Sequence, residues 1–588
     1  MSVRLASRHL EGVAPLLSSH DHTNTEFYFW SAMRLKLQLR RHFYQLPTQW
    51  QLRSRYVKQA VLGPHDWVRA IKRLRLKEQE YLTDTAIRNG RQPNRKRILI
   101  CSFQQFSPWV ELEYSLATAL RLRGHDVRGV LCDGLLPLCE MNLGPKHRPP
   151  CATCIGWLGR FEDAFGFKYA RLTDFLSQQD LAQAERLVEK TVDGDLEDLV
   201  VNGVPVGRLA RWELQRYYRG FVFDPVKETP GKYRLWMTTG VLLTWLFERV
   251  VDHERPDILL VSSGKTLPTR CALDVALRRR VRVVTWDTSP FYPNGVMFSH
   301  NKPAVNVDLD EEWKQLANEE LSLAEIHQLN DFLRRWSRSE TTPFPYNPTP
   351  VEDQQIIRGQ LKLRPASPLV LAFTNTSWDM AVVDRDVGFQ NMYDWIFALV
   401  KYAVMRPNID LVVRAHPAET RVPADLQSRT LATAEIRKRF DPLPSNIKLV
   451  DADSPISSYA LAAMAQVAVI YTSILGLELA LRGKRPWIAG ANSYRGKGFT
   501  LDLASKEHMY ELLDANVSDK LSENQVKLAQ KFAYLWIFRH VFRNRLIDPV
   551  DKRFSLSSFR ELAPGGLPFI DDLCDSILAG KPFIDIGM

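Results

Sequence analysis

Hydroxyl and carboxylate side chains follow a short apolar run at a spacing that suits phosphate binding. Residues 467–470 predict a buried strand, Tyr471-Thr472-Ser473 a polar turn, and residues 476–481 the opening of a helix. Backbone N–H groups and the positive dipole end at a helix N-terminus attract anions. Glu478 lies in the first turns, where a carboxylate can reach ribose hydroxyls beside a phosphate. An ordinary helix N-cap uses the same Thr and Ser types, so this motif alone leaves both interpretations open.

A second strand end carries groups of complementary chemistry. Residues 409–413 form another buried-strand pattern, which runs into Arg414, His416 and Pro417. Arginine binds phosphate in a bidentate manner, and histidine can donate to it and titrates near neutrality. Ligands of open α/β sheets bind at the carboxyl ends of strands. Two polar strand ends in the same half of the chain therefore favour a shared ligand crevice over a satisfied loop histidine.

A glycine-punctuated loop at residues 488–500 follows the next predicted strand. It contains Arg495 and Lys497, two cations suited to closing over a charged ligand. Its glycine spacing differs from the dinucleotide-binding fingerprint, and no helix follows at once.

The three motifs together resemble the bacterial capsule polysaccharide biosynthesis glycosyltransferases. They read Val-Val-Arg-x-His-Pro-Ala-Glu, Tyr-Thr-Ser-x-x-Gly-Leu-Glu-x-Ala-Leu-x-Gly-Lys and Ala-Gly-x-x-x-Tyr-Arg-Gly-Lys-Gly-Phe-Thr. That family is similar in turn to bacterial sialyltransferases and Kdo transferases, which carry a His-Pro motif and a Ser-Ser or Ser-Thr motif. The resemblance covers residues 369–514 strongly and residues 97–290 more loosely. Here the second motif reads Thr-Ser, which keeps both hydroxyls.

The resemblance implies a nucleotide-sugar transferase of GT-B type and a role for each matched residue. His416 would contact the donor phosphate and assist the nucleotide leaving group, Thr472 and Ser473 would hold the phosphate, and Glu478 the ribose. CMP-sugars are the favoured donors. The expected donor-binding residues are Arg414, His416, Thr472, Ser473, Glu478, Arg495 and Lys497.

Glycosyl transfer also needs a base for the acceptor hydroxyl. Asp133, at the end of a strand predicted at 127–131 and followed by glycine, is the first candidate, and it resembles the Asp/Glu-Gly base of related sialyltransferases. Asp287, which ends the strand at 283–286, is the second; each could equally be a turn carboxylate. Lys265 closes a Ser-Ser-Gly-Lys turn expected to line the acceptor cleft. No catalytic metal is expected, because cations and the helix dipole can neutralise the phosphate.

Strands and helices alternate along most of the chain, which predicts an α/β fold. We expect a GT-B arrangement of two Rossmann-like domains facing a cleft, with a helical basic N-terminal extension. The expected parts are a basic helical segment at 1–95, an acceptor domain with a Cys-rich loop and helical insertion at 96–340, a Pro-rich linker at 341–365, a donor domain at 366–548 and a C-terminal tail at 549–588.

The basic excess is concentrated in one segment. Residues 34–98 contain 17 Lys and Arg and four Asp and Glu, whereas the whole chain of 588 residues has a net charge of +11. Aromatic and aliphatic residues interleave with these cations, which suits an anionic membrane surface as well as it suits a solvated basic face. Nucleic acid ranks below both, because no recognition motif is present. Without an apolar run of about 20 residues or a secretory signal, we expect a cytoplasmic protein with peripheral inner-membrane contact.

Four of the seven cysteines cluster at Cys132, Cys139, Cys151 and Cys154. Four thiolates from two close pairs can hold a tetrahedral zinc ion, which would order the loop between them. An iron–sulfur cluster or metal-free reduced thiols are the alternatives.

The sequence thus predicts a glycosyltransferase acting on a growing capsule or surface polysaccharide or glycolipid. Two other hypotheses remain: a transferase of polyol phosphate from a CDP-linked donor, and a catalytically inactive assembly scaffold.

Overall fold

The computed structural model describes residue 75 and residues 94–103, 109–139, 151–167, 169–337, 349–515, 517, 520–546 and 556–586. Residues 65–588 form one compact unit, separate from residues 1–64. Apart from residues 75, 94 and 95, the basic segment expected at 1–95 therefore lies outside the described residues, as does most of the Pro-rich run at 341–350. Everything below concerns the described part of the second unit.

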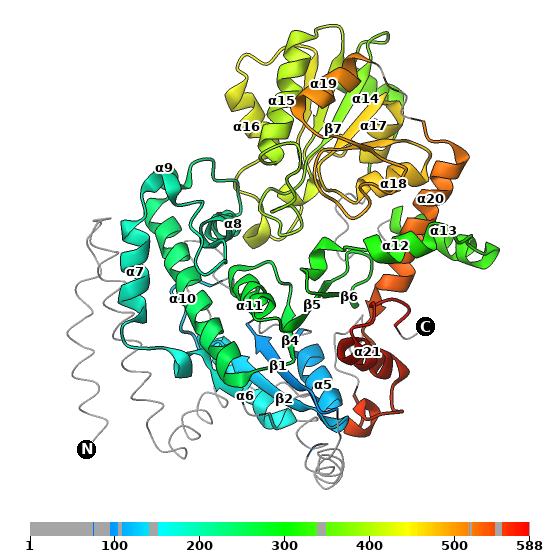
Figure 1. Cartoon of the computed structure of the whole chain (residues 1–588). Coiled ribbons are helices and arrows are strands. Elements are labelled where there is room, and N and C mark those ends of the chain that lie inside the picture. Colours follow the sequence, from blue (N-terminus) through cyan, green and yellow to red (C-terminus); the bar gives the residue numbers. More distant parts are fainter. Residues whose placement is uncertain are drawn as a thin grey trace. The chain divides into compact units, whose positions relative to one another are not determined.

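A seven-stranded sheet forms the centre of the first α/β half (Figure 1). Its order is β13-β6-β5-β4-β1-β2-β3; the strands from β5 to β3 are parallel, β6 pairs antiparallel with β5, and β13 pairs antiparallel with β6. The strands are β1 (Arg97–Ser102), β2 (Asp126–Leu131), β3 (Tyr169–Arg171), β4 (Ile258–Ser262), β5 (Arg282–Thr288), β6 (Gly295–His300) and β13 (Phe542–Arg543).

Helices precede and follow these strands along the chain, and the 25-residue α10 is the longest of those described. Proline at its first position suits a helix start, because that N–H has no intrahelical partner. The helices of this half are α5 (Trp109–Leu122), α6 (Cys151–Phe165), α7 (Asp180–Lys190), α8 (Val206–Tyr218), α9 (Pro225–Glu228), α10 (Pro230–Glu254), α11 (Leu267–Arg278), α12 (Asp310–Leu316) and α13 (Leu323–Ser337). The last two of them, α12 and α13, bury Trp313, Leu329 and Phe332 in the core of the second half.

The second half is built on six parallel strands in the order β12-β11-β10-β7-β8-β9. Every residue of β7, β8 and β10 is buried, as expected for a parallel sheet covered on both faces. The strands are β7 (Leu369–Phe373), β8 (Asp410–Arg414), β9 (Ile447–Val450), β10 (Val467–Ile470), β11 (Pro486–Ile488) and β12 (Leu501–Asp502). Its helices are α14 (Gln354–Leu361), α15 (Met392–Met405), α16 (Ala432–Arg439), α17 (Ser458–Met464), α18 (Leu475–Leu481), α19 (Lys506–Asp514) and α20 (Glu523–Tyr534).

The C-terminal part of the chain returns to the first half. Strand β13 pairs with β6, and helix α21 (Pro568–Ala579) packs against α5 in the core of the first half (Figure 1). Part of the segment expected as a tail therefore contributes buried side chains such as Phe569 and Ile570.

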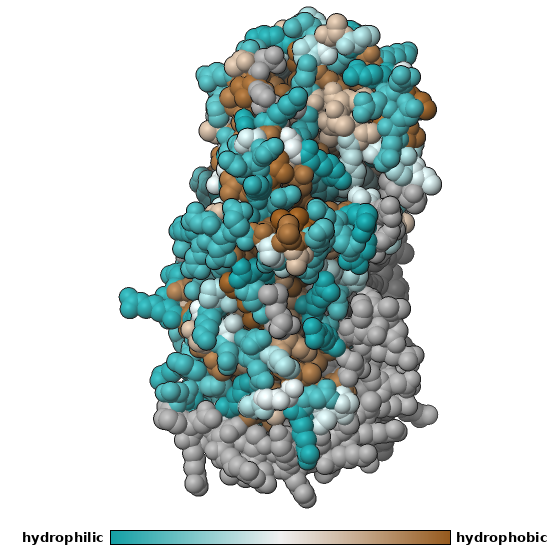
Figure 2. Space-filling model, turned by 90° about the vertical axis from the view of Figure 1, so that its right-hand side faces the viewer, coloured by the Kyte–Doolittle hydropathy of each residue, from teal (hydrophilic) through white to brown (hydrophobic). Residues whose placement is uncertain are grey.

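The predicted α/β fold with two Rossmann-like halves is confirmed. The strand predicted at 467–470 matches the observed bounds of β10, and the strand predicted at 127–131 begins one residue earlier as β2. None of the described helices is long and apolar enough to cross a membrane. The face shown in Figure 2 is mainly hydrophilic, and hydrophobic residues occur on it in small groups.

Candidate functional site

A cavity of about 240 Å³ lies at the carboxyl edge of the second sheet, where β7, β8 and β10 end. Four of the seven predicted donor-binding residues line it: Arg414, His416, Ser473 and Glu478. The lining residues are Trp336, Ser337, Pro350, Glu352, Phe373, Thr374, Arg414, Ala415, His416, Pro417, Ser457, Ser458, Tyr459, Ser473, Ile474, Leu475 and Glu478. The structure therefore brings together the His-Pro motif and the Thr-Ser motif, which are separate in the sequence.

The backbone fixes the orientation of the His416 ring. The ring Nδ1 accepts a hydrogen bond from the N–H of Ala418 at 3.1 Å, and the backbone N–H of His416 donates to Thr374 Oγ1 at 3.2 Å. Pro417 begins the short 3₁₀ helix that places Ala418 there. Because Nδ1 acts as an acceptor, the neutral ring carries its proton on Nε2.

The electrostatic environment keeps this imidazole uncharged. Burial, and then the neighbouring Arg414 guanidinium, lower the pKa of His416 to about 4. At neutral pH the side chain is therefore a hydrogen-bond donor without a net charge. The expectation from the sequence that His416 titrates near neutrality is therefore wrong.

Arg414 contributes mainly to the architecture of the cavity wall. It is only 1 % exposed, and its guanidinium donates to the carbonyls of Asp451 and Ser454, the latter at 3.2 Å. Burial lowers its pKa to about 10. Arg414 thus ties the segment 451–454 to the end of β8.

The two hydroxyls of the Thr-Ser motif differ in position. Ser473 lines the cavity, and its Oγ accepts from the N–H of Leu475 at 3.3 Å. Thr472 is not among the lining residues; its N–H donates to Asn375 Oδ1 at 3.3 Å, and its buried hydroxyl has no hydrogen-bond partner among the described residues. The structure therefore places Ser473, rather than Thr472, at the cavity surface.

Glu478 lies in the cavity wall with both oxygens engaged. Trp336 donates its Nε1–H to Oε1 at 3.0 Å, and the Tyr459 hydroxyl donates to Oε2. Burial raises the pKa of Glu478. Two aromatic side chains thus position this carboxylate beside the cavity.

The two cations of the glycine-punctuated loop are not among the lining residues. Arg495 donates to the carbonyls of Ile488 at 2.9 Å and Leu503 at 2.7 Å. Lys497 is 7 % exposed and forms an ion pair with Asp310. In this structure both side chains fasten the loop.

The two candidate bases differ in their accessibility. Asp133 is 0 % exposed, and its Oδ2 accepts from the Thr173 hydroxyl at 2.5 Å. Asp287, at the end of β5, is half-buried, and its Oδ1 accepts from the N–H of Thr288 at 2.8 Å. Only the second is open to a ligand.

Asp287 also faces the second half of the unit. Burial raises its pKa to about 6, the Ser263 hydroxyl and Thr288 N–H oppose this, and the negative charge of Asp379 adds to it. Asp379 follows β7, the strand whose end forms part of the cavity. Lys265 lies in the same region: it is 1 % exposed, donates to Val383 O at 2.5 Å, and has a pKa lowered to about 7 by burial.

The cysteine cluster is only partly described. Cys132, Cys139 and Cys154 are half-buried, whereas nothing is described of the Cys151 side chain or of residues 140–150. Within the described residues no group of three or more His, Cys, Asp or Glu side chains could hold a metal ion. The four-cysteine zinc site therefore stays a prediction.

Several cavity residues were missed in the sequence. Thr374 and Asn375 follow β7 directly. The strand-end rule, that ligands of open α/β sheets bind at the carboxyl ends of strands, pointed to His416 and could have pointed to these two residues as well. Trp336 comes from α13 and Tyr459 from α17, and no local pattern marks either of them.

Gly476 allows close packing beneath the Thr-Ser turn. A Cβ there would lie 2.2 Å from the Tyr494 hydroxyl, which donates to the Ser473 carbonyl. We expect Gly476→Ala to lower the free energy of unfolding by about 1–3 kcal/mol, measured by denaturant unfolding. Gly359→Ala in α14, with no atom within 4 Å of the new Cβ, is the control and should be neutral or stabilising. Equal effects of the two substitutions would contradict this packing role.

No family model matches the sequence, and no curated protein matches it. Among solved structures, the chain is similar to a beta Kdo 2,4 transferase, KpsC of Thermosulfurimonas dismutans, with 16% identity and a TM-score of 0.33 over 54% of this chain and 86% of that one. It is similar to the beta Kdo 2,7 transferase of the same organism, with 14% identity and a TM-score of 0.30 over 54% and 88%. The alpha,alpha-trehalose 6-phosphate synthase of Burkholderia multivorans is similar at 11% identity, with a TM-score of 0.29 over 83% and 100%.

Two Rossmann-like α/β halves within one unit give the chain a GT-B-type fold.

Proposed function

We propose that this chain is a glycosyltransferase that uses a CMP-activated sugar and extends a capsule or surface polysaccharide or a glycolipid. The observation that carries the proposal is the convergence of His416, Ser473 and Glu478 around one cavity of about 240 Å³. Two motifs that the sequence marks separately for phosphate and ribose binding supply these side chains.

The donor would be held by its phosphate and its ribose. The Nε2–H of His416 and the Ser473 hydroxyl can donate to phosphate oxygens, and the Glu478 carboxylate can accept from ribose hydroxyls. Trp336 and Tyr459 flank Glu478 and offer aromatic surface beside it. The cavity thus combines a few polar groups with apolar walls, as is usual for small-ligand sites.

The reaction is a displacement at the anomeric carbon. A base takes the proton of the acceptor hydroxyl, whose oxygen forms the new bond to the sugar while the bond from sugar to phosphate breaks. The electron pair of the broken bond stays on the CMP phosphate. His416 would stabilise the charge that develops there, which is the kind of preorganised stabilisation that contributes strongly to catalysis. Among the two candidate bases, accessibility favours Asp287 over Asp133.

Further parts of the proposal rest on the sequence. The basic segment 34–98 would hold the enzyme at an anionic membrane surface, where lipid-linked glycan acceptors are located. A zinc ion held by Cys132, Cys139, Cys151 and Cys154 would order the loop between them.

Thermal unfolding of the full chain with CMP, CDP, UDP, GDP and ADP in parallel tests the donor class. A ligand that binds only the native state stabilises it by about 2.7 kcal/mol at 100 times its Kd. We expect the largest stabilisation with CMP and a loss of that effect in Glu478→Ala. A preference for UDP or GDP would contradict the CMP assignment, and no effect of any nucleotide would contradict the donor site itself.

The alternative CDP-linked donor differs in what reaches the acceptor. A CMP-sugar donates only its sugar, whereas a CDP-polyol donates a phosphate as well. Incubation with a donor labelled at the phosphorus distal to cytidine would therefore label the acceptor only in the second case, and that result would replace the sugar-transfer proposal.

A further inference from the structure

A second cavity lies at the opposite edge of the first sheet from the acceptor-side residues. It has a volume of about 560 Å³ and is located where β1, β2 and β3 begin. The lining residues are Arg95, Arg121, Gly124, His125, Asp126, Val127, Arg128, Gly129, Gly166, Phe167, Tyr169, Ala170 and Glu254. We call it the amino-edge pocket. Asp133 and Asp287 follow the carboxyl ends of strands in the same sheet, so this pocket is separate from the proposed reaction site.

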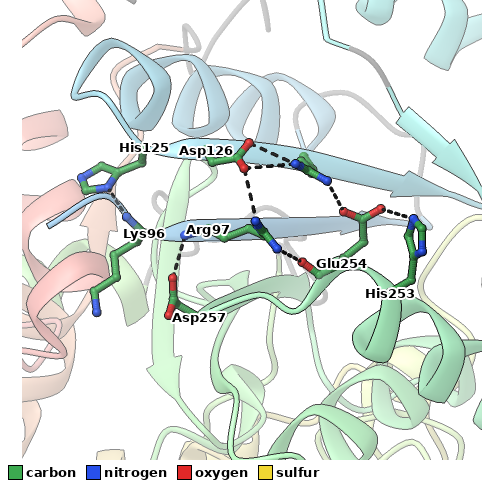
Figure 3. A network of polar contacts seen from close by, with 8 residues as sticks. Lys96, Arg97, His125, Asp126, His253, Glu254 and Asp257 are labelled. Atoms are coloured by element: carbon green, nitrogen blue, oxygen red, sulfur yellow. Dashed lines mark hydrogen bonds and ion pairs between the residues drawn. The ribbon is translucent and has the colours of Figure 1, made fainter. Parts of the chain in front are cut away.

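The acidic groups of the amino-edge pocket are already paired with cations (Figure 3). Asp126 contacts Arg97 Nε at 3.4 Å and Arg128 at 3.2 Å, and Glu254 contacts Arg128 at 3.0 Å. The backbone N–H of Arg97 donates to Asp257 at 2.7 Å. These carboxylates are therefore neutralised within the protein.

Two further arginines at this pocket have no such counter-charge. No described carboxylate lies within ion-pair distance of Arg95 or Arg121, and both side chains are exposed. The Arg121 guanidinium lies 4.8 Å from the centre of the Phe167 ring, which presents it on an aromatic surface. Among the described residues, the pocket thus carries an excess of positive charge.

A third guanidinium, that of Arg75, lies near them, and the negative charge of Asp163 acts on it. Arg75 donates to the carbonyl of Asp163 at 2.9 Å and approaches Gly166, whose carbonyl Arg121 also reaches at 3.5 Å. Burial, and then the positive charge of Arg75, lower the pKa of Arg121. The positive charge of Arg75 thus acts on Arg121, and an anion beside Arg121 would offset it.

His125 adds a neutral donor to the same wall. Its Nδ1 accepts from the N–H of Lys96 at 3.1 Å, which leaves the proton on Nε2, and the Lys96 side chain extends away from the ring (Figure 3). Burial, and then the positive charges of Arg123, Lys96 and Arg95, lower the pKa of His125. The cations around His125 thus come from the segments before β1 and after α5.

We propose that the amino-edge pocket binds a phosphate group through Arg95 and Arg121. Phosphate offers several oxygens that can be shared between guanidinium groups, and arginine binds it in a bidentate manner. The group could belong to a lipid headgroup or to a free phosphate. This site does not depend on the transfer reaction proposed above.

Binding of the full chain to vesicles tests the lipid source. We would compare co-sedimentation with phosphatidylcholine vesicles and with vesicles in which part of this lipid is replaced by phosphatidylglycerol. Arg95→Gln/Arg121→Gln should weaken binding to the anionic vesicles about tenfold or more, since each cation near such a surface contributes about 1 kcal/mol. Arg186→Gln/Arg280→Gln removes the same charge from exposed positions of the same half and should change binding less.

Calorimetric titration with inorganic pyrophosphate tests the free source. His416→Ala serves as the background, so that binding at the donor cavity is reduced in every protein compared. Loss of pyrophosphate binding in the Arg95/Arg121 variant alone supports a site for free phosphate, and loss of vesicle binding alone supports a lipid headgroup. The proposal is overturned if the Arg95/Arg121 variant matches the Arg186/Arg280 control in both measurements. Arg95→Lys/Arg121→Lys, which keeps the charge, should restore part of the binding.

Discussion

Replacing His416 with asparagine is expected to lower kcat/KM for CMP release from a CMP-sugar about 10²–10³-fold, because one preorganised donor to the developing phosphate charge is lost. The ring is neutral at working pH, with a pKa of about 4. The loss is therefore that of a hydrogen bond, and we expect the remaining activity above pH 5 to show no titration that His416 could supply. Steady-state kinetics with a panel of CMP-sugars, including CMP-Kdo, measures both effects.

The two amide variants of His416 separate binding from architecture. Asparagine keeps an acceptor near the position of Nδ1, which caps the N–H of Ala418, and it lacks a donor at the position of Nε2. Glutamine reaches the Nε2 position with its amide and loses the cap. We expect His416→Gln to retain more activity than His416→Asn, while His416→Asn retains more thermal stability. The reverse order of activities would assign His416 a structural role only.

The strand-end rule explains why part of the site could be predicted from sequence. His416 follows β8 and Ser473 follows β10, and both strands end at the same edge of one sheet. The sequence does not reveal that β7 lies between them, and this order makes Thr374 and Asn375 partners of the two motifs. Thr374 accepts from the His416 N–H, and Asn375 accepts from the Thr472 N–H.

Other parts of the site depend on tertiary packing, which leaves no local pattern. Trp336 and Tyr459 reach Glu478 from α13 and α17, segments far from it in the sequence. Arg495 and Lys497 have the composition of a ligand-closing loop, but the structure directs Arg495 to backbone carbonyls and Lys497 to Asp310. Charge and glycine content alone do not distinguish these two roles of a cation.

The fold was easier to predict than the side-chain roles, because burial of a strand leaves a local pattern in the sequence and the tertiary contacts of single side chains do not. The strands β7, β8 and β10 are buried on both faces, so their sequences are apolar apart from Asp410 and Arg414 at the two ends of β8. Short edge strands carry a weaker pattern. Strand β3, with three partly buried residues, and the two-residue β12 and β13 were therefore not predicted.

The sequence does not decide whether Asp133 or Asp287 is the general base, and the burial of the two side chains in the structure does. Both aspartates follow a strand at the carboxyl edge of the first sheet, so the strand-end rule favours them equally. A general base must touch the acceptor hydroxyl within hydrogen-bond distance. The carboxylate of Asp133 is fully buried and bonded by Thr173, whereas Asp287 is half-buried. We therefore expect Asp133→Asn to affect stability more than the rate of transfer.

Replacing Asp287 with asparagine should lower kcat/KM for sugar transfer about 10²–10⁴-fold, the contribution typical of a positioned base. Its pKa is raised to about 6 by burial. Because the base acts in its unprotonated form, the rate of the unmodified enzyme should reach a plateau about one pH unit above 6, fall to half of it near pH 6 and decrease further below. This acid limb should disappear in Asp287→Asn, and it should persist at the same pH in Asp133→Asn. A limb near pH 6 that survives in Asp287→Asn would assign the titration to another group, and Asp287 would then no longer be the base.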